Sequence, residues 1–182
     1  MIRSGNEGAS LIAQTIGGSI SGFVDMMNQA ALNLGCTDTH FANANGLHDD
    51  AHVTTARDMA KIAQAAMQNE TFRAIAKTYT YRLPKSNLQR ARVIVGNSEN
   101  WLNANEDNPN YYPYATGIKT GYHSRAGYCY VGSAEKDGVS LISVVFYTTK
   151  SGRWTDSKKL MEYGFSQFVS VTPLDLYNMI WL

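Results

Sequence analysis

The sequence predicts a mixed α/β protein of the α+β type, in which an antiparallel sheet is flanked by helices. Two observations lead to this fold class. Several segments of the N-terminal half repeat apolar residues at helical spacing, whereas residues 115–147 alternate apolar and polar positions in successive short runs. A further helical pattern covers residues 154–168, and we expect this helix to pack across the sheet.

Length and composition fit one globular domain. The chain has 182 residues, of which 44% are hydrophobic and 17% are charged, so it can form a core and is not disordered. The net charge of +1 and the scattered basic residues argue against a nucleic-acid partner. No stretch approaches the roughly 20 apolar residues of a membrane span, and the first residues do not resemble an export signal. Cys36 and Cys129 are too few for a disulfide scaffold, and both a bridge and two buried free thiols stay open.

The first two predicted helices follow one another directly. Apolar residues recur at helical spacing from Ala9 to Ile16, with Asn6 placed to cap this helix and a glycine pair placed to end it. A second helix runs from about Ser21 to Leu34, before a glycine in the C-terminal capping position. The spacing of its apolar residues is typical of a helix that packs into a core.

Residues 37–53 form a predicted loop that is rich in turn-forming residues and histidine. His48 and His52, with Asp49 and Asp50 between them, resemble a metal site. A His-x-x-x-His pair binds one ion well only on a helix, however, and the glycine and the aspartates favour a loop. We therefore expect neither a metal site nor a cofactor.

Two shorter helices, one strand and a long connection come next. Thr55, with Asp58 three residues later, resembles a capping box, and a second short helical stretch follows. Residues 78–81 alternate like a strand. Residues 96–113 then form a long polar connection, of the kind often found at functional sites.

Three strands are predicted at residues 115–122, 127–134 and 139–147. The last two are joined by Lys136-Asp137-Gly138, which is a hairpin signal. Because all the connections are short, neighbouring strands must run in opposite directions. The sequence therefore predicts an antiparallel meander.

Two short motifs point to acyl-transfer chemistry. Ser4-Gly5-Asn6 stands at the head of the first helix, and Lys119-Thr120-Gly121 lies on the first strand of the meander. A serine hydroxyl and a lysine ammonium that face each other can pass a proton to a leaving amine, while an asparagine amide holds a carbonyl. The strand edge can pair with an extended peptide, and Thr120 can donate to a terminal carboxylate. By itself, the first motif is equally consistent with a plain turn and helix cap.

In combination, five segments resemble the D-alanyl-D-alanine carboxypeptidases, the low-molecular-mass penicillin-binding proteins. These segments are residues 4–9, 33–47, 52–60, 117–122 and 126–129. The resemblance extends from Ser4 to about Phe168 and implies a domain of the DD-peptidase and β-lactamase-like fold. It also implies a serine peptidase that removes the terminal D-alanine from peptidoglycan stem peptides and is acylated by β-lactams.

The resemblance implies a role for each matched residue. Ser4 matches the second serine, which assists proton transfer, and Asn6 matches the asparagine that binds the substrate carbonyl. Lys119 matches the strand lysine that holds Ser4 and the nucleophile electrostatically and also lines the substrate site.

Further residues match the family's substrate-binding positions. Thr120 matches the hydroxyl that meets the substrate carboxylate, beside Gly121, and the backbone N–H of Tyr122 falls where the family completes its oxyanion hole. Arg153 matches an arginine whose fork also engages the carboxylate; the alternative is a solvated residue before the last helix. Leu47 matches a loop residue that would touch substrate.

One part of the family pattern is missing. The Ser-x-x-Lys that carries the nucleophile and the general base does not occur upstream, and we interpret the literal match from Ser133 to Lys136 as accidental. We therefore expect a fragment without its nucleophile. Residues 1–169 would form the C-terminal two-thirds of a catalytic domain, and residues 170–182 an exit segment that begins a further module. Such a chain would be inactive and less stable, and its sheet would keep an open edge.

Three functions follow from these observations. The leading one is a fragment of an exported D-alanyl-D-alanine carboxypeptidase, extracytoplasmic in the cell envelope, whose parent meets the membrane only through parts absent here. Its partners would be stem peptides ending in D-Ala-D-Ala and β-lactams, not nucleic acid. A class A β-lactamase would need a deacylating glutamate, which residues 41–53 lack. The third is a non-catalytic module that binds D-alanine-ended peptides through Thr120 and Arg153.

Overall fold

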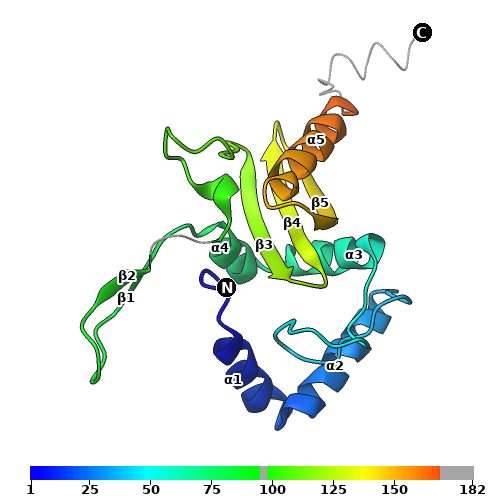
Figure 1. Cartoon of the computed structure of the whole chain (residues 1–182), viewed down its shortest axis with the longest axis vertical. Helices are drawn as coiled ribbons and strands as arrows, with labels where there is room; N and C mark the ends of the chain where they lie inside the picture. The colour runs from blue at the N-terminus through cyan, green and yellow to red at the C-terminus, as the bar shows by residue number, and fades with distance from the viewer. Residues whose placement is uncertain (95–97, 169–182) are drawn as a thin grey trace, which may run out of the picture.

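The computed structural model describes residues 1–94 and 98–168 of the chain (Figure 1). The exit segment expected at residues 170–182 lies outside these ranges. The described elements are, in chain order, α1 (Asn6–Gly17), α2 (Ile20–Asn33), α3 (Ala56–Ala66), α4 (Glu70–Lys77), β1 (Tyr81–Leu83), β2 (Arg92–Ile94), the 3-10 helix η1 (Asn100–Leu102), β3 (Ala115–His123), β4 (Gly127–Lys136), β5 (Val139–Thr148) and α5 (Gly152–Ser166). Within the two described ranges, no helix combines the length and the apolar character needed to cross a membrane.

The centre of the structure is the antiparallel meander that the sequence predicted. Its strands have the order β3-β4-β5. Asp137 and Gly138 join β4 to β5 with φ angles of 51° and 79°, and positive φ at both central residues is typical of the tight turn that Asp-Gly favours. Helices α3 and α4 pack on one face of the sheet and α5 packs on the other, as the sequence predicted for α5 (Figure 1).

The core lies between α5 and the sheet and is built mainly of aromatic rings. The ring centroids of Trp101 and Tyr130 are 5.1 Å apart, and those of Tyr130 and Trp154 are 4.9 Å apart. Trp101 and Tyr112 are fully buried, although both belong to the long connection predicted at residues 96–113. Each buried aromatic ring removes about 150–250 Å² from water, so these rings hold the connection against the sheet.

Gly117 lets α4 approach the strand that carries the lysine motif. Its φ is +126°, and the register of β3 and β4 shifts between Ala115 and Gly117, which marks a bulge. A Cβ atom on Gly117 would come within 2.9 Å of the Cβ of Ala76 in α4. Glycine is therefore required at this position, two residues before Lys119.

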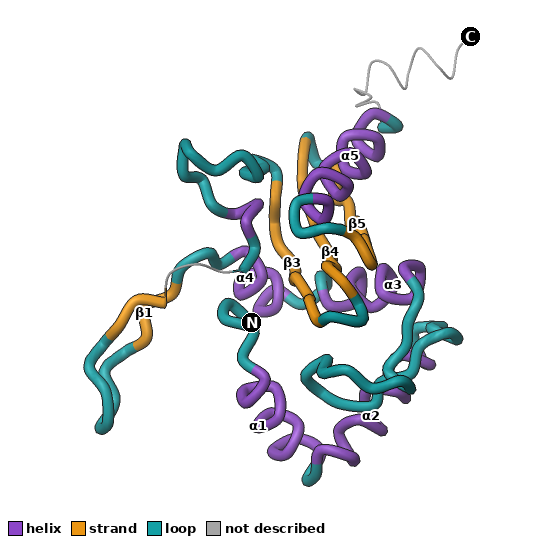
Figure 2. Tube along the Cα trace, viewed as in Figure 1, coloured by secondary structure: helices purple, strands orange, loops and turns teal. Residues whose placement is uncertain are grey.

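Helices α1 and α2 form an arm that extends away from the sheet (Figures 1 and 2). The two helices contact each other, and Ala13 on α1 and Ala31 on α2 are each buried. The expectation that α2 forms a core face holds only in part, because Leu34 is exposed. On α1, Ile12 and Ile16 are 55% and 60% exposed. Helical spacing predicted both helices correctly, but it could not show that several of their apolar side chains are exposed.

The structure differs from the predictions at the strand expected from residues 78–81. Helix α4 continues to Lys77 and Thr78 forms its C-terminal cap, so the strand starts later, as β1. It pairs with β2, which the sequence did not predict, and this hairpin projects away from the sheet (Figure 2). Because β1 has exposed residues and no buried face, it lacks the alternation of a half-buried strand.

The cap predicted for the first helix is also wrong. Gly5 is the N-cap and makes no side-chain capping bond, while Asn6 is already the first helical residue. Ser4 has a φ of +50°, and its N–H donates to the carbonyl of Met1 at 2.9 Å, so the chain turns before Asn6. This turn, which sequence spacing does not reveal, moves the start of α1 by one residue.

Both cysteines are free thiols, so the structure has no bridge between Cys36 and Cys129. Cys36 is buried, and its thiol donates to the carbonyl of Asp58 at 3.4 Å. Burial and the nearby Asp58 carboxylate raise the pKa of the Cys36 thiol, which keeps it protonated and unreactive. Cys129 is half-buried on β4.

Asp58 fastens α3 to the loop that precedes it. Thr55 caps α3 as predicted, because its side chain accepts from the N–H of Asp58. The buried Asp58 carboxylate accepts from the N–H of Asp38 at 2.9 Å and the hydroxyl of Thr39 at 3.0 Å, and pairs with Lys61 at 3.3 Å. Burial favours the neutral acid, but these partners together outweigh burial and lower the pKa of Asp58.

We expect Asp58→Asn to lower the urea midpoint of unfolding at pH 7. The folded pKa of Asp58 lies below its unfolded value, so its contribution is present above about pH 4 and is lost as pH falls through the folded pKa. Unfolding at pH 7 and at pH 3 should therefore show a smaller acid-induced loss in Asp58→Asn than in wild type. The exposed Asp107→Asn is the control, and equal losses in all three proteins would contradict the prediction.

Candidate active site

The two predicted motifs meet in space. The Nζ of Lys119 donates to the Oγ of Ser4 at 2.9 Å, although 115 residues separate them along the chain. The same Nζ donates to the carbonyl of Thr120 at 2.8 Å, which fixes the lysine along the edge of β3. The side chains of Ser4 and Lys119 therefore form one hydrogen-bonded pair between the arm and the sheet.

Ser4 is held in an unusual backbone conformation. A φ of +50° places this non-glycine residue in the left-handed region, at a cost of roughly 1–2 kcal/mol. Such conformations cluster at functional sites, where the surrounding structure imposes them. The turn directs the Ser4 hydroxyl to Lys119, whereas Asn6 lies at the exposed start of α1.

Lys119 lies in a partly desolvated and positively charged setting. Burial lowers its pKa, the Glu99 carboxylate acts in the opposite direction, and the Arg153 guanidinium lowers it further. Lys119 and Arg153, which come from β3 and α5, are therefore close enough to repel each other. Two cations in one partly buried site favour binding of an anion.

Thr120 carries the second hydroxyl that the sequence singled out. It is nearly buried, and its register partner on β4 is Tyr130. Its Oγ1 lies 2.8 Å from the Oγ of Ser98, and either atom can be the donor in this bond. Ser98 was not predicted as a site residue; it fixes the Thr120 hydroxyl from the connection that runs along β3.

Arg153 is held by aromatic rings. Its Cζ lies 4.5 Å from the ring centroid of Trp154 and 5.1 Å from that of Tyr128. Within the described ranges, its buried Nε has no hydrogen-bond partner. Burial lowers the pKa of the Arg153 guanidinium, while Tyr128 and Glu99 act to raise it. A guanidinium held in this way is oriented to receive an anion such as a carboxylate.

An exposed tyrosine, Tyr122, lies near the end of β3, the strand that carries the lysine motif. Tyr122 is 61% exposed, and its ring stacks on Tyr128 with centroids 4.3 Å apart. Gly121 pairs with Cys129 on β4. Tyr128 thus contacts both Tyr122 and Arg153. The oxyanion role of the Tyr122 N–H remains a prediction.

The loop that carries Leu47 is anchored at two points. Its Asn45 amide reaches the hydroxyl of Ser10 in α1 at 3.5 Å, and the rings of His48 and His123, at the end of β3, have centroids 5.2 Å apart. Leu47 itself is exposed. The loop therefore touches both elements that carry the motifs, and contact of Leu47 with substrate remains a prediction.

Sequence reasoning missed one buried acid, Glu99. It is only 1% exposed, and its Oε1 accepts from the Tyr130 hydroxyl at 2.8 Å and the N–H of Trp101 at 3.3 Å. Burial raises the pKa of Glu99 to about 7, although these hydrogen bonds and the charges of Arg153 and Lys119 act to lower it. The only sequence signal was an acidic residue two positions before a tryptophan in a polar connection.

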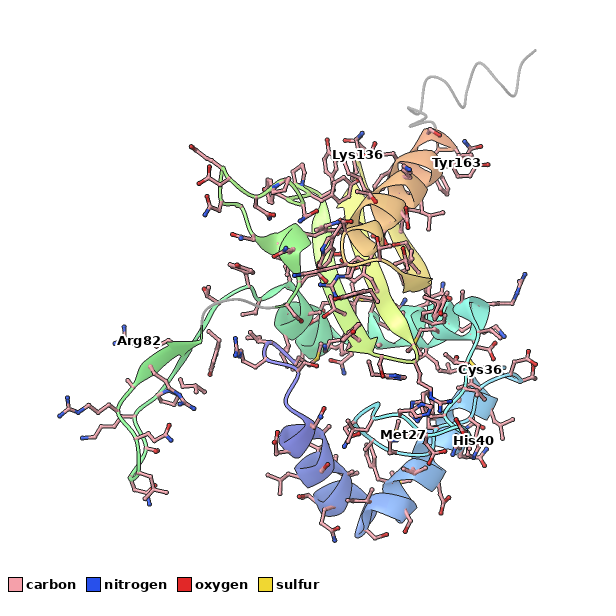
Figure 3. All side chains as sticks on the ribbon, viewed as in Figure 1. Met27, Cys36, His40, Arg82, Lys136 and Tyr163 are labelled. Carbon is pink, nitrogen blue, oxygen red and sulfur yellow. The ribbon has the colours of Figure 1, made fainter. Side chains whose placement is uncertain are left out.

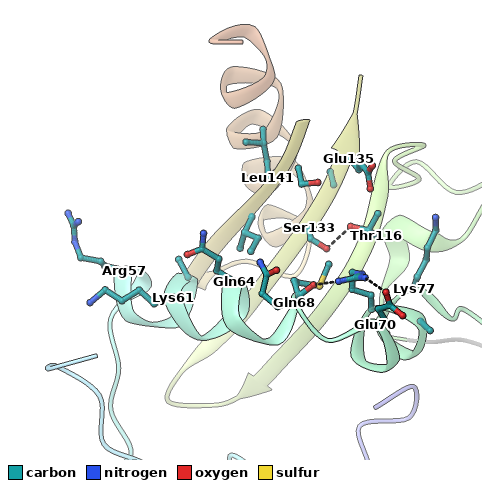
Figure 4. Close-up of a pocket in the computed structure, with 17 residues that line it drawn as sticks. Arg57, Lys61, Gln64, Gln68, Glu70, Lys77, Thr116, Ser133, Glu135 and Leu141 are labelled. Carbon is teal, nitrogen blue, oxygen red and sulfur yellow. Dashed lines mark hydrogen bonds and ion pairs between the residues drawn. The ribbon is translucent and has the colours of Figure 1, made fainter. Parts of the chain in front are cut away.

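The literal Ser-x-x-Lys match has the wrong geometry for catalysis. Ser133 is buried on β4, and its Oγ lies 2.7 Å from the Oγ of Thr116, on the side of α3 and α4 (Figure 4). Lys136 points to the opposite face, where its Nζ lies 5.0 Å from the ring centroid of Tyr114, beside α5 (Figure 3). Residues three apart on a strand face opposite ways, so Lys136 cannot reach Ser133.

A cleft of about 930 Å³ lies between the sheet and helices α3 and α4 (Figure 4). Ser133 and Thr116 line it, together with basic and amide side chains of the two helices. None of Ser4, Lys119 and Arg153 is among the described residues that line it. This cleft is therefore separate from the site built by the motifs.

Comparisons with known proteins show the family of the chain. A family model described as D-alanyl-D-alanine carboxypeptidase matches residues 1–150. The chain is 34% identical over 173 residues to the D-alanyl-D-alanine carboxypeptidase of Streptomyces sp. strain K15, covering 91% of this chain and 58% of that protein. It is 36% identical over 176 residues to the D-alanyl-D-alanine carboxypeptidase DacA of Escherichia coli K12, covering 95% of this chain and 40% of that protein. The chain thus spans about half the length of the curated relatives it matches.

Solved structures give the same result. The S216A mutant of the Streptomyces K15 DD-transpeptidase matches with a TM-score of 0.82 and 34% identity, covering 91% of this chain and 65% of that one. The D-alanyl-D-alanine carboxypeptidase of Mycobacterium tuberculosis H37Rv matches with a TM-score of 0.77 and 31% identity, covering 93% of this chain and 61% of that one. The fold class predicted from the sequence is confirmed.

Proposed function

Because the chain belongs to the D-alanyl-D-alanine carboxypeptidase family, as the resemblance predicted, we propose that it forms the substrate-binding part of a serine-type D-Ala-D-Ala carboxypeptidase. Its substrates would be peptidoglycan stem peptides, met outside the cytoplasm in the cell envelope, and β-lactams would acylate the same centre. Family membership sets the β-lactamase alternative aside.

The hydrogen bond from Lys119 to Ser4 carries this proposal. In acyl transfer a nucleophilic serine attacks the carbonyl carbon of the scissile bond, the C–N bond breaks, and the leaving amine of the terminal D-alanine takes up a proton. A serine hydroxyl held by an ammonium can deliver that proton, so we assign this step to Ser4. Water then hydrolyses the acyl-enzyme. The nucleophile itself is not among the residues that we assign.

Thr120 and Arg153 would bind the terminal carboxylate of the peptide. The hydroxyl is fixed by Ser98, and the guanidinium is oriented by Tyr128 and Trp154. A fork of donors and a hydroxyl suit the two oxygens of a carboxylate. Asn6 would hold the substrate carbonyl and Leu47 would contact the peptide, as in the family pattern.

We expect Arg153→Ala to weaken binding of a peptide ending in D-Ala-D-Ala about tenfold, because one charge-assisted contact to the carboxylate is lost. Arg153→Lys should be nearly as weak, because it keeps the charge without the fork. Calorimetric titration measures both, with the C-terminally amidated peptide and an L-Ala-L-Ala peptide as ligand controls. Equal affinity of wild type for the acid and the amide would refute a carboxylate site.

Labelling with a fluorescent penicillin tests the assignment of Ser4. We expect the 182-residue chain to bind D-Ala-D-Ala peptide reversibly and to form no covalent adduct, in wild type and in Ser4→Ala and Ser133→Ala. An adduct found by mass spectrometry and lost in one variant would make that serine the nucleophile and overturn our assignment. A chain that binds neither peptide nor penicillin would refute the proposed function.

A further inference from the structure

We propose that Glu99 is a positioning residue of the substrate-carboxylate site, and that its buried charge sets how strongly Lys119 and Arg153 attract the carboxylate of a bound peptide. This inference rests on the proposed function and extends it to a residue outside the motifs. Glu99 would not touch the substrate; it would act through the two cations.

The first argument is the position of Glu99 directly behind the substrate-binding strand. Its Oε1 accepts from the hydroxyl of Tyr130, which is buried on β4 and is the register partner of Thr120 on β3. The preceding residue, Ser98, contacts the Thr120 hydroxyl. Two consecutive residues of the connection thus contact paired positions of the sheet. Ser98 contacts Thr120 on β3, and Glu99 contacts Tyr130, the partner of Thr120 on β4.

The second argument is electrostatic. The charged and titratable side chains that face Glu99 in the described structure are Lys119 on β3, Tyr130 on β4 and Arg153 on α5. The negative charge of Glu99 acts to raise the pKa of both Lys119 and Arg153, while Arg153 acts to lower the pKa of Lys119. The carboxylate and the two cations therefore form one coupled cluster, in which Glu99 is the anion.

The protonation state of Glu99 changes the charge that a ligand meets. With Glu99 ionised, the cluster carries a net charge of about +1; with Glu99 neutral, it carries about +2. A peptide carboxylate stays ionised above about pH 4 and binds the more positive cluster more tightly. Burial brings the pKa of Glu99 to about 7, so both forms are populated near neutral pH. The affinity for the peptide should therefore fall as pH rises through about 7.

The test uses Glu99→Gln, because the amide keeps an oxygen that can accept from Tyr130. Binding of N-acetyl-Lys-D-Ala-D-Ala is measured by calorimetry between pH 5.5 and 8.5. In wild type we expect an affinity about fivefold weaker at pH 8.5 than at pH 5.5, as for a modest coupling between the ligand carboxylate and a carboxylate that does not touch it. Glu99→Gln should lack this step and bind more tightly than wild type at pH 8.5. Glu106→Gln, the same change at an exposed site of the same connection, should behave like wild type.

A second measurement reads the coupling without any peptide. Titration of the Lys119 ¹⁵Nζ by NMR should show a lower pKa in Glu99→Gln than in wild type, because the anion that stabilises the ammonium is gone. Tyr130→Phe removes the donor that stabilises ionised Glu99, so it should move the step in peptide affinity to higher pH.

The outcomes separate the two proposals. If peptide binds but the pH step survives in Glu99→Gln, or the pKa of Lys119 is unchanged there, the role of Glu99 is refuted and the proposed function stands. If no protein binds peptide at any pH, the proposed function is refuted and the role of Glu99 toward substrate falls with it.

Discussion

Replacing Lys119 by alanine is expected to weaken binding of a D-Ala-D-Ala peptide about 100-fold, or about 3 kcal/mol. The substitution removes the ammonium that binds Ser4 at 2.9 Å and one of the two cations of the proposed carboxylate site. It also leaves the Ser4 hydroxyl without this donor. Hydrogen bonds to charged groups contribute roughly 1.5–3 kcal/mol each, so the loss of these contacts accounts for the expected size.

Two further variants show whether the geometry of Lys119 matters beyond its charge. Lys119→Arg keeps the charge but places it on a wider, planar group, so we expect only partial recovery of affinity. Lys85→Ala removes an exposed lysine from the distant hairpin and should bind like wild type. An affinity of Lys119→Ala within threefold of wild type would show that Lys119 is not part of the binding site.

Replacing Trp101 by alanine is expected to lower the free energy of unfolding by about 3–5 kcal/mol, the usual cost of removing a large buried ring. Trp101 is fully buried, and its ring centroid lies 4.9 Å from that of Tyr112 and 5.1 Å from that of Tyr130. The substitution would leave a cavity between α5 and the sheet and would free the connection that carries Glu99.

Urea unfolding followed by circular dichroism measures this loss. Trp101→Phe keeps a ring and should cost clearly less than the alanine variant, while Tyr163→Ala removes a ring that is 67% exposed on α5 and should change stability by less than about 1 kcal/mol (Figure 3). If Trp101→Ala and Tyr163→Ala are equally stable, the aromatic core described above does not hold the sheet and α5 together.

Sequence patterns within short windows predicted the elements whose structure depends mainly on neighbouring residues. The meander, the turn at Asp137 and Gly138 and helix α5 all follow from alternation, turn residues and helical spacing within short windows. The β1–β2 hairpin was missed because it has no buried face to impose alternation. The exposure of Ile12 and Ile16 was missed because spacing defines an apolar face but not what covers it.

The same division applies to the site. Ser4 and Lys119 could be paired from the sequence because family motifs preserve residue types at set positions, and the structure joins them by a hydrogen bond. Glu99 and Ser98 belong to a connection without regular spacing. Their roles depend on how that connection packs along β3, which is a tertiary property that no short pattern records.

Opening of the arm formed by α1 and α2 would break the Ser4–Lys119 pair, because Ser4 lies just before the start of α1. Amide protons of a segment that packs mainly on itself exchange with solvent through local opening, at a free energy below that of global unfolding. Ser4 is joined to the rest of the chain through α1 and α2, whereas Lys119 lies on β3, which is paired with β4. The Ser4–Lys119 hydrogen bond should therefore be formed only in molecules in which the arm is closed. A ligand that contacts both Ser4 and Lys119 should therefore slow deuterium uptake along α1 more than it slows uptake in the sheet.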